Sequence, residues 1–235
     1  MAREAVIVSA VRTAIGRFGG ALGRIPPQDY GAAVIKEALR RVDLDPREID
    51  DVIFGNCLNA GGNIARLCAL QAGLPVEIPG LTVDRQCGSG LNAVNLAAQA
   101  VLAGQGDVYI AGGTESMSLQ PFVLERAEFF SKRPPQFRAR FQLSPDAIGN
   151  PPMGITAENL AEKYGISREE QDRFALESQR KMARAMAEGA FREQILPLPV
   201  PVGKNETKVF DTDEHPRPDT TMEALAKLPP AFKEG

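Results

Sequence analysis

Residues 81–104 read LTVDRQCGSGLNAVNLAAQAVLAG, and the neighbouring segments are best interpreted outward from them. The short apolar run at residues 81–83 is typical of a buried strand. Cys87 follows, and then a segment rich in Ala, Leu and Val runs to Gly104, a residue type that commonly ends a helix. These residues therefore predict a strand, a cysteine-bearing turn and a helix in succession.

The same alternation of strands and helices extends in both directions. It comprises predicted strands at residues 5–10, 51–55, 81–83 and 107–111, and predicted helices at residues 29–42, 63–72 and 88–103. Such alternation favours a parallel sheet with helices on its faces. We therefore expect an α/β fold, with a first domain over residues 1–118.

The character of the chain changes after residue 118, and we expect a second domain over residues 119–235. It begins with an irregular, proline-containing stretch at residues 121–152 that mixes basic and aromatic side chains. Such a stretch could bind nucleic acid, but an ordered loop or a subunit contact is the favoured interpretation. Two helices, at residues 156–164 and 167–189, and two strands, at 196–202 and 207–210, are predicted beyond it.

Composition excludes several classes of protein. Lys and Arg total 27 against 30 Asp and Glu, a net charge of −3, which argues against a strongly basic nucleic-acid binder. One histidine argues against a zinc site, so no metal is expected. The N-terminal apolar run is too short for a signal peptide or a membrane span, so no membrane association is expected. Three cysteines without a CxxC pair fit a reducing cytoplasm.

Cys87 is the candidate nucleophile. The predicted geometry places its thiol at a helix N-terminus, where free N–H groups and the helix dipole favour the thiolate. Gly88, Ser89 and Gly90 are small enough for a substrate to approach the backbone closely. The backbone N–H of Cys87 is a candidate oxyanion donor. A buried structural cysteine is the alternative for a cysteine in general.

The other reactive residue types are interpreted more simply. Cys57 and Cys68 are expected to be packing residues, because one follows a strand and the other lies on an apolar helix face. His215 lies on a predicted loop, where a solvated histidine is the favoured interpretation and a catalytic base for Cys87 the alternative.

Taken together, these segments resemble the N-terminal part of a thiolase. The motifs that carry the resemblance are Val8–Thr13 with Gly16, Gly55–Asn56, Asn63–Arg66, Cys87–Gly90, Gly112–Ser118, Met153–Asn159, Ser167–Gln171 and Leu228–Phe232. Condensing enzymes of the ketoacyl-synthase type also use a cysteine on this fold, but the segments Glu115–Met117 and Thr156–Asn159 argue against them.

The resemblance implies a fold and an activity. The fold would be the thiolase-like βαβαβ layered fold, here the first half-unit plus a loop domain that holds coenzyme A. The activity would be that of an acyl-CoA C-acyltransferase, either thiolytic cleavage of a 3-ketoacyl-CoA or condensation of acetyl-CoA. Cys87 would carry the acyl group as a thioester, and no cofactor would be bound covalently.

The resemblance also implies substrate-binding residues. Arg217 matches an arginine that contacts the nucleotide end of coenzyme A. Phe232 matches an apolar residue of its pantetheine or adenine pocket, and Met153 matches a methionine beside the acyl pocket. Many relatives have a histidine where this chain has Pro152, so part of the coenzyme A contact or of the acyl-chain selection would differ.

Family members continue past the position of Gly235 into a second half-unit that carries an Asn, a Gly-His-Pro histidine and a second catalytic cysteine. We therefore expect the C-terminal half-unit to be absent from this chain. A complementary chain, or truncation of the gene product, would account for it. The expected partners are acyl-CoA, coenzyme A and that complementary chain, in an oligomer. A non-catalytic acyl-CoA-binding or partner-binding module is the alternative function.

Overall fold

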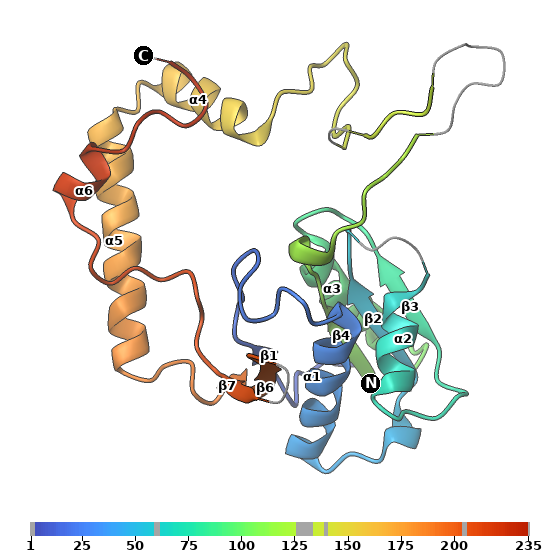
Figure 1. Ribbon diagram of the computed structural model, residues 1–235. Helices are drawn as coiled ribbons and strands as arrows, with labels where there is room; N and C mark the ends of the chain where they lie inside the picture. The colour runs from blue at the N-terminus through green and yellow to red at the C-terminus, as the bar shows by residue number, and fades with distance from the viewer. Residues whose placement is uncertain (1–2, 59–61, 126–133, 139–140, 204–205, 235) are drawn as a thin grey trace. The chain divides into compact units, whose positions relative to one another are not determined.

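The computed structural model describes residues 3–58, 62–125, 134–138, 141–203 and 206–234 (Figure 1). The chain divides into two compact units, Met1–Pro121 with Phe191–His215, and Phe122–Ala190 with Pro216–Gly235. The first division lies close to the boundary predicted at residue 118. Residues 191–215, which the sequence placed in the second domain, belong to the first unit.

A three-stranded parallel sheet forms the centre of the first unit. Its strands β2 (Asp51–Gly55), β3 (Gly80–Val83) and β4 (Tyr109–Gly113) are arranged in the order β3-β2-β4. The middle strand β2 is the most apolar, and four of its five residues are buried. Because all three strands run in the same direction, their carboxyl ends meet at one edge of the sheet.

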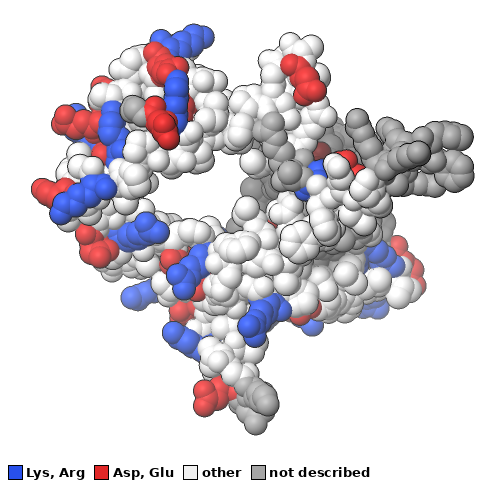
Figure 2. Space-filling view, turned by 45° about the horizontal axis from the view of Figure 1, so that its top comes forward, with Lys and Arg blue, Asp and Glu red and all other residues white. Residues whose placement is uncertain are grey.

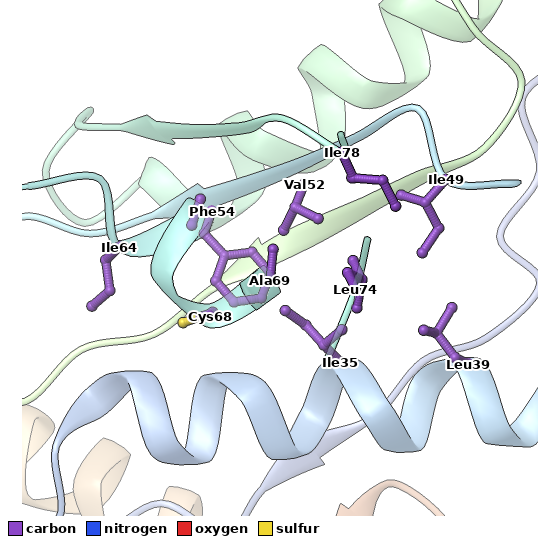
Figure 3. Close-up of a cluster of buried hydrophobic side chains, with 11 residues drawn as sticks. Ile35, Leu39, Ile49, Val52, Phe54, Ile64, Cys68, Ala69, Leu74 and Ile78 are labelled. Carbon is purple, nitrogen blue, oxygen red and sulfur yellow. The ribbon is translucent and has the colours of Figure 1, made fainter. Parts of the chain in front are cut away.

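Helices cover both faces of this sheet. Helices α1 (Pro27–Val42) and α2 (Ile64–Gln71) pack against each other and supply much of the core on one face, where Ile35 and Leu39 point from α1 toward the sheet, with Leu39 facing Ile49 (Figure 3). Val52 and Phe54 of β2 belong to the same cluster. Helix α3 (Ser89–Ala103) covers the other face through Ala93 and Ala97. The predicted α/β layering is therefore confirmed, since alternate residues of β2 enter opposite clusters.

The N-terminal strand predicted at residues 5–10 does not form among the described residues. Val6, Ile7 and Val8 are 69%, 79% and 70% exposed, and the first strand, β1 (Arg12–Thr13), begins beyond them. Apolar content shows that a segment suits a strand, but a strand also requires a neighbour that completes its backbone hydrogen bonds. The segment has no such neighbour in the described part of the chain.

Residues 191–215 join the first unit through pairing and ion contacts. Strand β5 (Ile195–Leu196) pairs in parallel with β1, and the hairpin of β6 (Leu198–Pro201) and β7 (Thr207–Phe210) packs in the same cluster as Tyr30. The Arg12 guanidinium donates to both carboxylate oxygens of Asp213, at 2.8 and 3.0 Å. Burial opposes the charge of Asp213, but these bonds and the Ile15 N–H outweigh it, so its pKa is lowered.

The second unit is built on two helices, α4 (Met153–Tyr164) and α5 (Arg168–Ala187). The predicted capping box is present, because the Ser167 hydroxyl accepts from the Glu170 N–H and the Glu170 carboxylate accepts from the Ser167 N–H. Residues 216–235 contain the short helix α6 (Met222–Ala226). The Arg168 guanidinium binds the backbone oxygens of Leu225 and Leu228 at 2.7 and 3.1 Å and ties that segment to α5.

Two short 3-10 helices, η1 (Pro46–Glu48) and η2 (Met117–Leu119), lie before β2 and after β4.

Acidic and basic side chains alternate over the face shown in Figure 2, with neither sign gathered into one patch. Among the described helices, none is both long and apolar enough to cross a membrane. Most basic and aromatic residues of the stretch considered for nucleic-acid binding fall at 126–133 and 139–140, outside the described residues.

Candidate active site

Cys87 lies in the turn that joins β3 to α3, and its residue is exposed. The hydroxyl of Ser89, the first residue of α3, shapes this turn: its oxygen accepts from the Arg85 N–H at 2.8 Å and it donates to the Gln86 carbonyl at 2.6 Å. Gln86 has a φ of 49°, a left-handed conformation that is uncommon for a residue other than glycine. These bonds hold the strained peptide immediately before the thiol.

The end of β2 packs closely against the start of α3, next to the Cys87 turn. A Cβ atom built on Gly55 would lie 2.6 Å from the Gly90 nitrogen and 2.7 Å from the Ser89 Cβ atom. Any larger residue at this position would therefore displace the first turn of α3. The absence of a side chain at Gly55 lets the strand end and the helix start approach closely, which positions the thiol over the carboxyl edge of the sheet.

Glu115 links the ends of β2 and β4 at this edge. Its carboxylate accepts from the Asn56 side-chain amide at 2.9 Å, from the Cys57 N–H at 2.7 Å and from the Leu58 N–H at 3.3 Å. No role is predicted for Glu115 from the sequence, although a carboxylate two residues beyond a strand at the carboxyl edge of a parallel sheet is a signal for one. The site therefore combines an exposed thiol with a loop held by a carboxylate.

Among the described residues, no acceptor is bonded to the Cys87 N–H. In contrast, the Gly88 N–H is bonded to the Arg85 carbonyl at 3.1 Å, and the Ser89 N–H to the Gln86 carbonyl at 3.0 Å. The Cys87 amide is thus available to an oxygen that gains negative charge beside the thiol, and its role as an oxyanion donor stays a prediction.

The other two cysteines occupy different environments. Cys68 is fully buried in α2, as predicted, and burial raises its pKa to about 11. Cys57 is partly exposed, on the loop after β2 at the same edge as Cys87, and burial is the largest cause that raises its pKa. The expectation that Cys57 is only a packing residue does not account for this position.

His215 is exposed on the segment after β7. Its neighbour Asp213 is engaged by Arg12, and no hydrogen bond joins His215 to Cys87 in the part of the chain that the structure describes. The favoured interpretation of His215 as a solvated loop residue agrees with this position.

Met153 and Phe232, predicted to border the substrate, come together in the second unit. Met153 begins α4, and the Phe232 ring lies so close to Gly154 that a Cβ atom there would overlap it. The two side chains are 66% and 60% exposed. An ion pair between Lys233 and Glu162 of α4 holds the segment after Phe232 in place. The Phe232 ring thus lies against Gly154, the residue that follows Met153 in α4.

Arg217 lies elsewhere in the second unit. Its N–H donates to the Gln179 side chain of α5 at 2.7 Å, and its carbonyl accepts from the Thr220 hydroxyl at 2.7 Å. Gln179 is eleven residues beyond Arg168, which corresponds to about 16 Å along the helix. Arg217 is exposed, and its backbone is held beside α5, whereas Phe232 lies beside α4.

No group of three or more His, Cys, Asp or Glu side chains within the described ranges is arranged to hold a metal ion.

Comparisons with known proteins agree on one family. Residues 5–235 match the model described as thiolase, N-terminal domain. The acetyl-CoA acetyltransferase of Pseudomonas aeruginosa is 48% identical over 237 residues, which cover 99% of this chain and 60% of that protein. The acetyl-CoA acetyltransferase of Syntrophomonas wolfei is 45% identical over 242 residues, 100% of this chain and 61% of that protein.

The same family appears among solved structures. The acetyl-CoA acetyltransferase of Bacillus anthracis matches with a TM-score of 0.90 and 40% identity, over 99% of this chain and 60% of that one. This chain therefore spans 60–61% of the length of the relatives that it matches here.

Proposed function

Because this chain belongs to the thiolase family, we propose that it supplies the nucleophile of an acyl-CoA C-acyltransferase, with Cys87 as the residue that carries the acyl group. The observation that carries this proposal is the exposed thiol at the carboxyl edge of a parallel sheet, two residues before the start of α3. The relatives named above are acetyl-CoA acetyltransferases, which supports coenzyme A thioesters as the class of substrate.

In the thiolytic direction, the Cys87 thiolate attacks the ketone carbon of a 3-ketoacyl-CoA. The bond between that carbon and the α-carbon breaks, the shortened acyl group stays on the Cys87 sulfur as a thioester, and the α-carbon takes a proton to give acetyl-CoA. The thiol of a second coenzyme A then attacks the thioester, which forms the shortened acyl-CoA and frees Cys87. The Cys87 N–H stabilises the oxyanion at each attack.

The second unit is proposed to hold the coenzyme A part of the substrate. Met153 and Phe232 are exposed apolar side chains that suit the pantetheine or acyl portion. Arg217 offers a cation for the phosphates or nucleotide. Binding of coenzyme A as a substrate requires no covalently attached cofactor.

The cycle also requires a base for the Cys87 proton and a group that moves a proton at the α-carbon. We propose that these come from the portion of the relatives that residues 1–235 do not cover, supplied by a complementary chain within an oligomer. The resemblance to thiolases suggests the Gly-His-Pro histidine and the second cysteine of that portion as the base and the proton-transfer group. A cytoplasmic location is part of the same proposal.

Limited alkylation tests the nucleophile. At neutral pH, iodoacetamide should label Cys87 first, because Cys57 and Cys68 have raised pKa values and Cys68 is buried. Trypsin places the three cysteines on separate peptides, residues 48–66, 67–85 and 86–126, so mass spectrometry reads each one independently. The Cys68 peptide should become labelled only as the pH approaches about 11. Faster labelling of Cys57 or Cys68 at neutral pH would remove Cys87 from the role.

Calorimetry tests Arg217. If its guanidinium contacts a phosphate or the nucleotide, Arg217→Ala should weaken coenzyme A binding about 10- to 100-fold, because a hydrogen bond to a charged group is worth roughly 1.5–3 kcal/mol. Arg47→Ala is the matched control, since it removes another exposed arginine in the first unit. Equal affinities of the two variants would place Arg217 outside the binding site.

A further inference from the structure

A second thiol lies beside the nucleophile and has no part in the proposed cycle. The Cys57 thiol donates to the Gln86 carbonyl at 3.3 Å, and its sulfur lies 3.2 Å from the Ser89 hydroxyl oxygen. Gln86 and Ser89 flank Cys87 in the same turn. The loop that bears Cys57 is anchored in this position by the bond from the Cys57 N–H to Glu115.

These contacts bound the separation between the two cysteines. In a trans peptide of standard dimensions, the carbonyl oxygen lies about 2.8 Å from the next Cα atom. Because the Cys57 sulfur is 3.3 Å from the Gln86 oxygen, it lies within about 6 Å of the Cys87 Cα atom. A disulfide requires the two sulfurs to approach to about 2.05 Å. The Cys57 sulfur lies on the side of the turn that carries Cys87, so rotation of the exposed Cys87 side chain together with movement of its turn would bring the two sulfurs together.

The two thiols also differ in solvent exposure and in ease of ionisation, so an oxidant distinguishes between them. Cys87 is exposed, whereas Cys57 is partly covered. Burial raises the pKa of Cys57, the hydrogen bond with Ser89 partly offsets this, and the carboxylates of Asp84 and Glu115 add to the rise, so its thiol ionises less readily than a solvated thiol. An oxidant in solution therefore reacts first at Cys87, while Cys57 remains a reduced thiol next to it.

We propose that Cys57 is a resolving cysteine for Cys87. A peroxide oxidises the Cys87 thiolate to a sulfenic acid and is itself reduced to an alcohol or water. The Cys57 sulfur then attacks the sulfenic sulfur, the S–O bond breaks, and the Cys57 proton leaves with the hydroxyl group as water. The resulting Cys57–Cys87 disulfide blocks the nucleophile reversibly, and two equivalents of a thiol reductant restore both cysteines.

This inference rests on the proposed role of Cys87 as a reactive thiol. It gives the site a protected oxidised form, because a disulfide is reducible by thiols whereas sulfinic and sulfonic acids on Cys87 are not. Cys68 is no alternative partner, because it is fully buried in the cluster between α1, α2 and the sheet.

Peptide mapping after oxidation is the test. The reduced chain is treated with hydrogen peroxide, blocked with iodoacetamide and digested with trypsin without reductant. The expected product is a disulfide-linked pair of the peptides 48–66 and 86–126 from monomeric protein, with peptide 67–85 recovered as a free alkylated thiol. Dithiothreitol should return both linked peptides to their free form.

Cys57→Ser is the informative variant, because serine keeps a donor for the Gln86 carbonyl but cannot form the disulfide. In this variant dimedone should trap the sulfenic acid on peptide 86–126, and sulfinic acid should accumulate there faster than in the parent chain. Equal rates of sulfinic acid formation in both proteins, with no linked peptide in the parent, would overturn the inference.

The alkylation rate of the reduced parent chain separates this failure from failure of the proposed function. Rapid labelling of Cys87 without a linked pair overturns only the resolving role of Cys57. Slow labelling of Cys87 overturns its role as a nucleophile as well.

Discussion

Residues 1–235 alone should not turn over acetoacetyl-CoA, whereas a mixture with a protein that supplies the Gly-His-Pro and Cys-x-Gly half of a thiolase should. A thiolase-type cycle needs a base for Cys87 and a proton donor or acceptor at the α-carbon. General acid–base assistance is typically worth 10²–10⁴-fold in rate, and an oxyanion donor about 10²–10³-fold. Among the described residues the only histidine, His215, makes no hydrogen bond to Cys87.

The measurement is the loss of acetoacetyl-CoA in the presence of coenzyme A, for each protein separately and for the mixture. The added half alone is the matched control, because it lacks Cys87. Activity in the mixture only would support the proposed division of the site. Strong activity of the isolated chain would contradict it and direct attention to His215 as a base. If neither preparation is active but coenzyme A still binds, the function becomes that of a non-catalytic acyl-CoA-binding module.

Cys87→Ser should lower the activity of the mixture by on the order of 10⁴-fold or more, because a serine hydroxyl is a far weaker nucleophile without a base matched to it. The acyl-enzyme gives a second readout. After brief incubation with acetyl-CoA, peptide 86–126 of the parent protein should carry an acetyl group, and the same peptide of the variant should not.

Cys68→Ala is the control for this variant, since it removes a different thiol of the same unit. Because Cys68 is buried, this substitution is expected to change the stability of the unit and to leave the exposed Cys87 turn unchanged. Retained coenzyme A affinity in Cys87→Ser would show that the loss is chemical. If peptide 48–66 or 67–85 of the parent protein carried the acetyl group instead, the acyl-carrying residue would be Cys57 or Cys68, which would contradict the assignment to Cys87.

Features that depend on neighbouring residues alone were predictable from the sequence. Gly104 ends α3 in the left-handed conformation, and Ser167 with Glu170 forms the capping box of α5. The strands β2 and β3 lie at the predicted residues, give or take one position. Each of these signals combines local backbone preference with the spacing of apolar residues, and both act over a few residues. The placement of Cys87 between strand and helix follows from the same local signals.

Other features required partners that local sequence does not name. Residues 5–10 have the composition of a strand but form none in the described chain, whereas the short β5 pairs with β1 and brings residues 191–215 into the first unit. Their hydrogen-bond partners lie many residues away, and nothing in either segment specifies the other.

The same holds for the chemistry of the site. The sequence by itself determined that Cys87 lies between a strand and a helix, because local periodicity and small residues are enough for that. Only the tertiary structure decided that Cys57 reaches the Gln86 carbonyl, that Glu115 holds the Cys57 loop and that Phe232 lies on Gly154. These contacts join segments brought together by packing and strand order, and packing depends on the shapes of many side chains at once rather than on any one stretch of sequence.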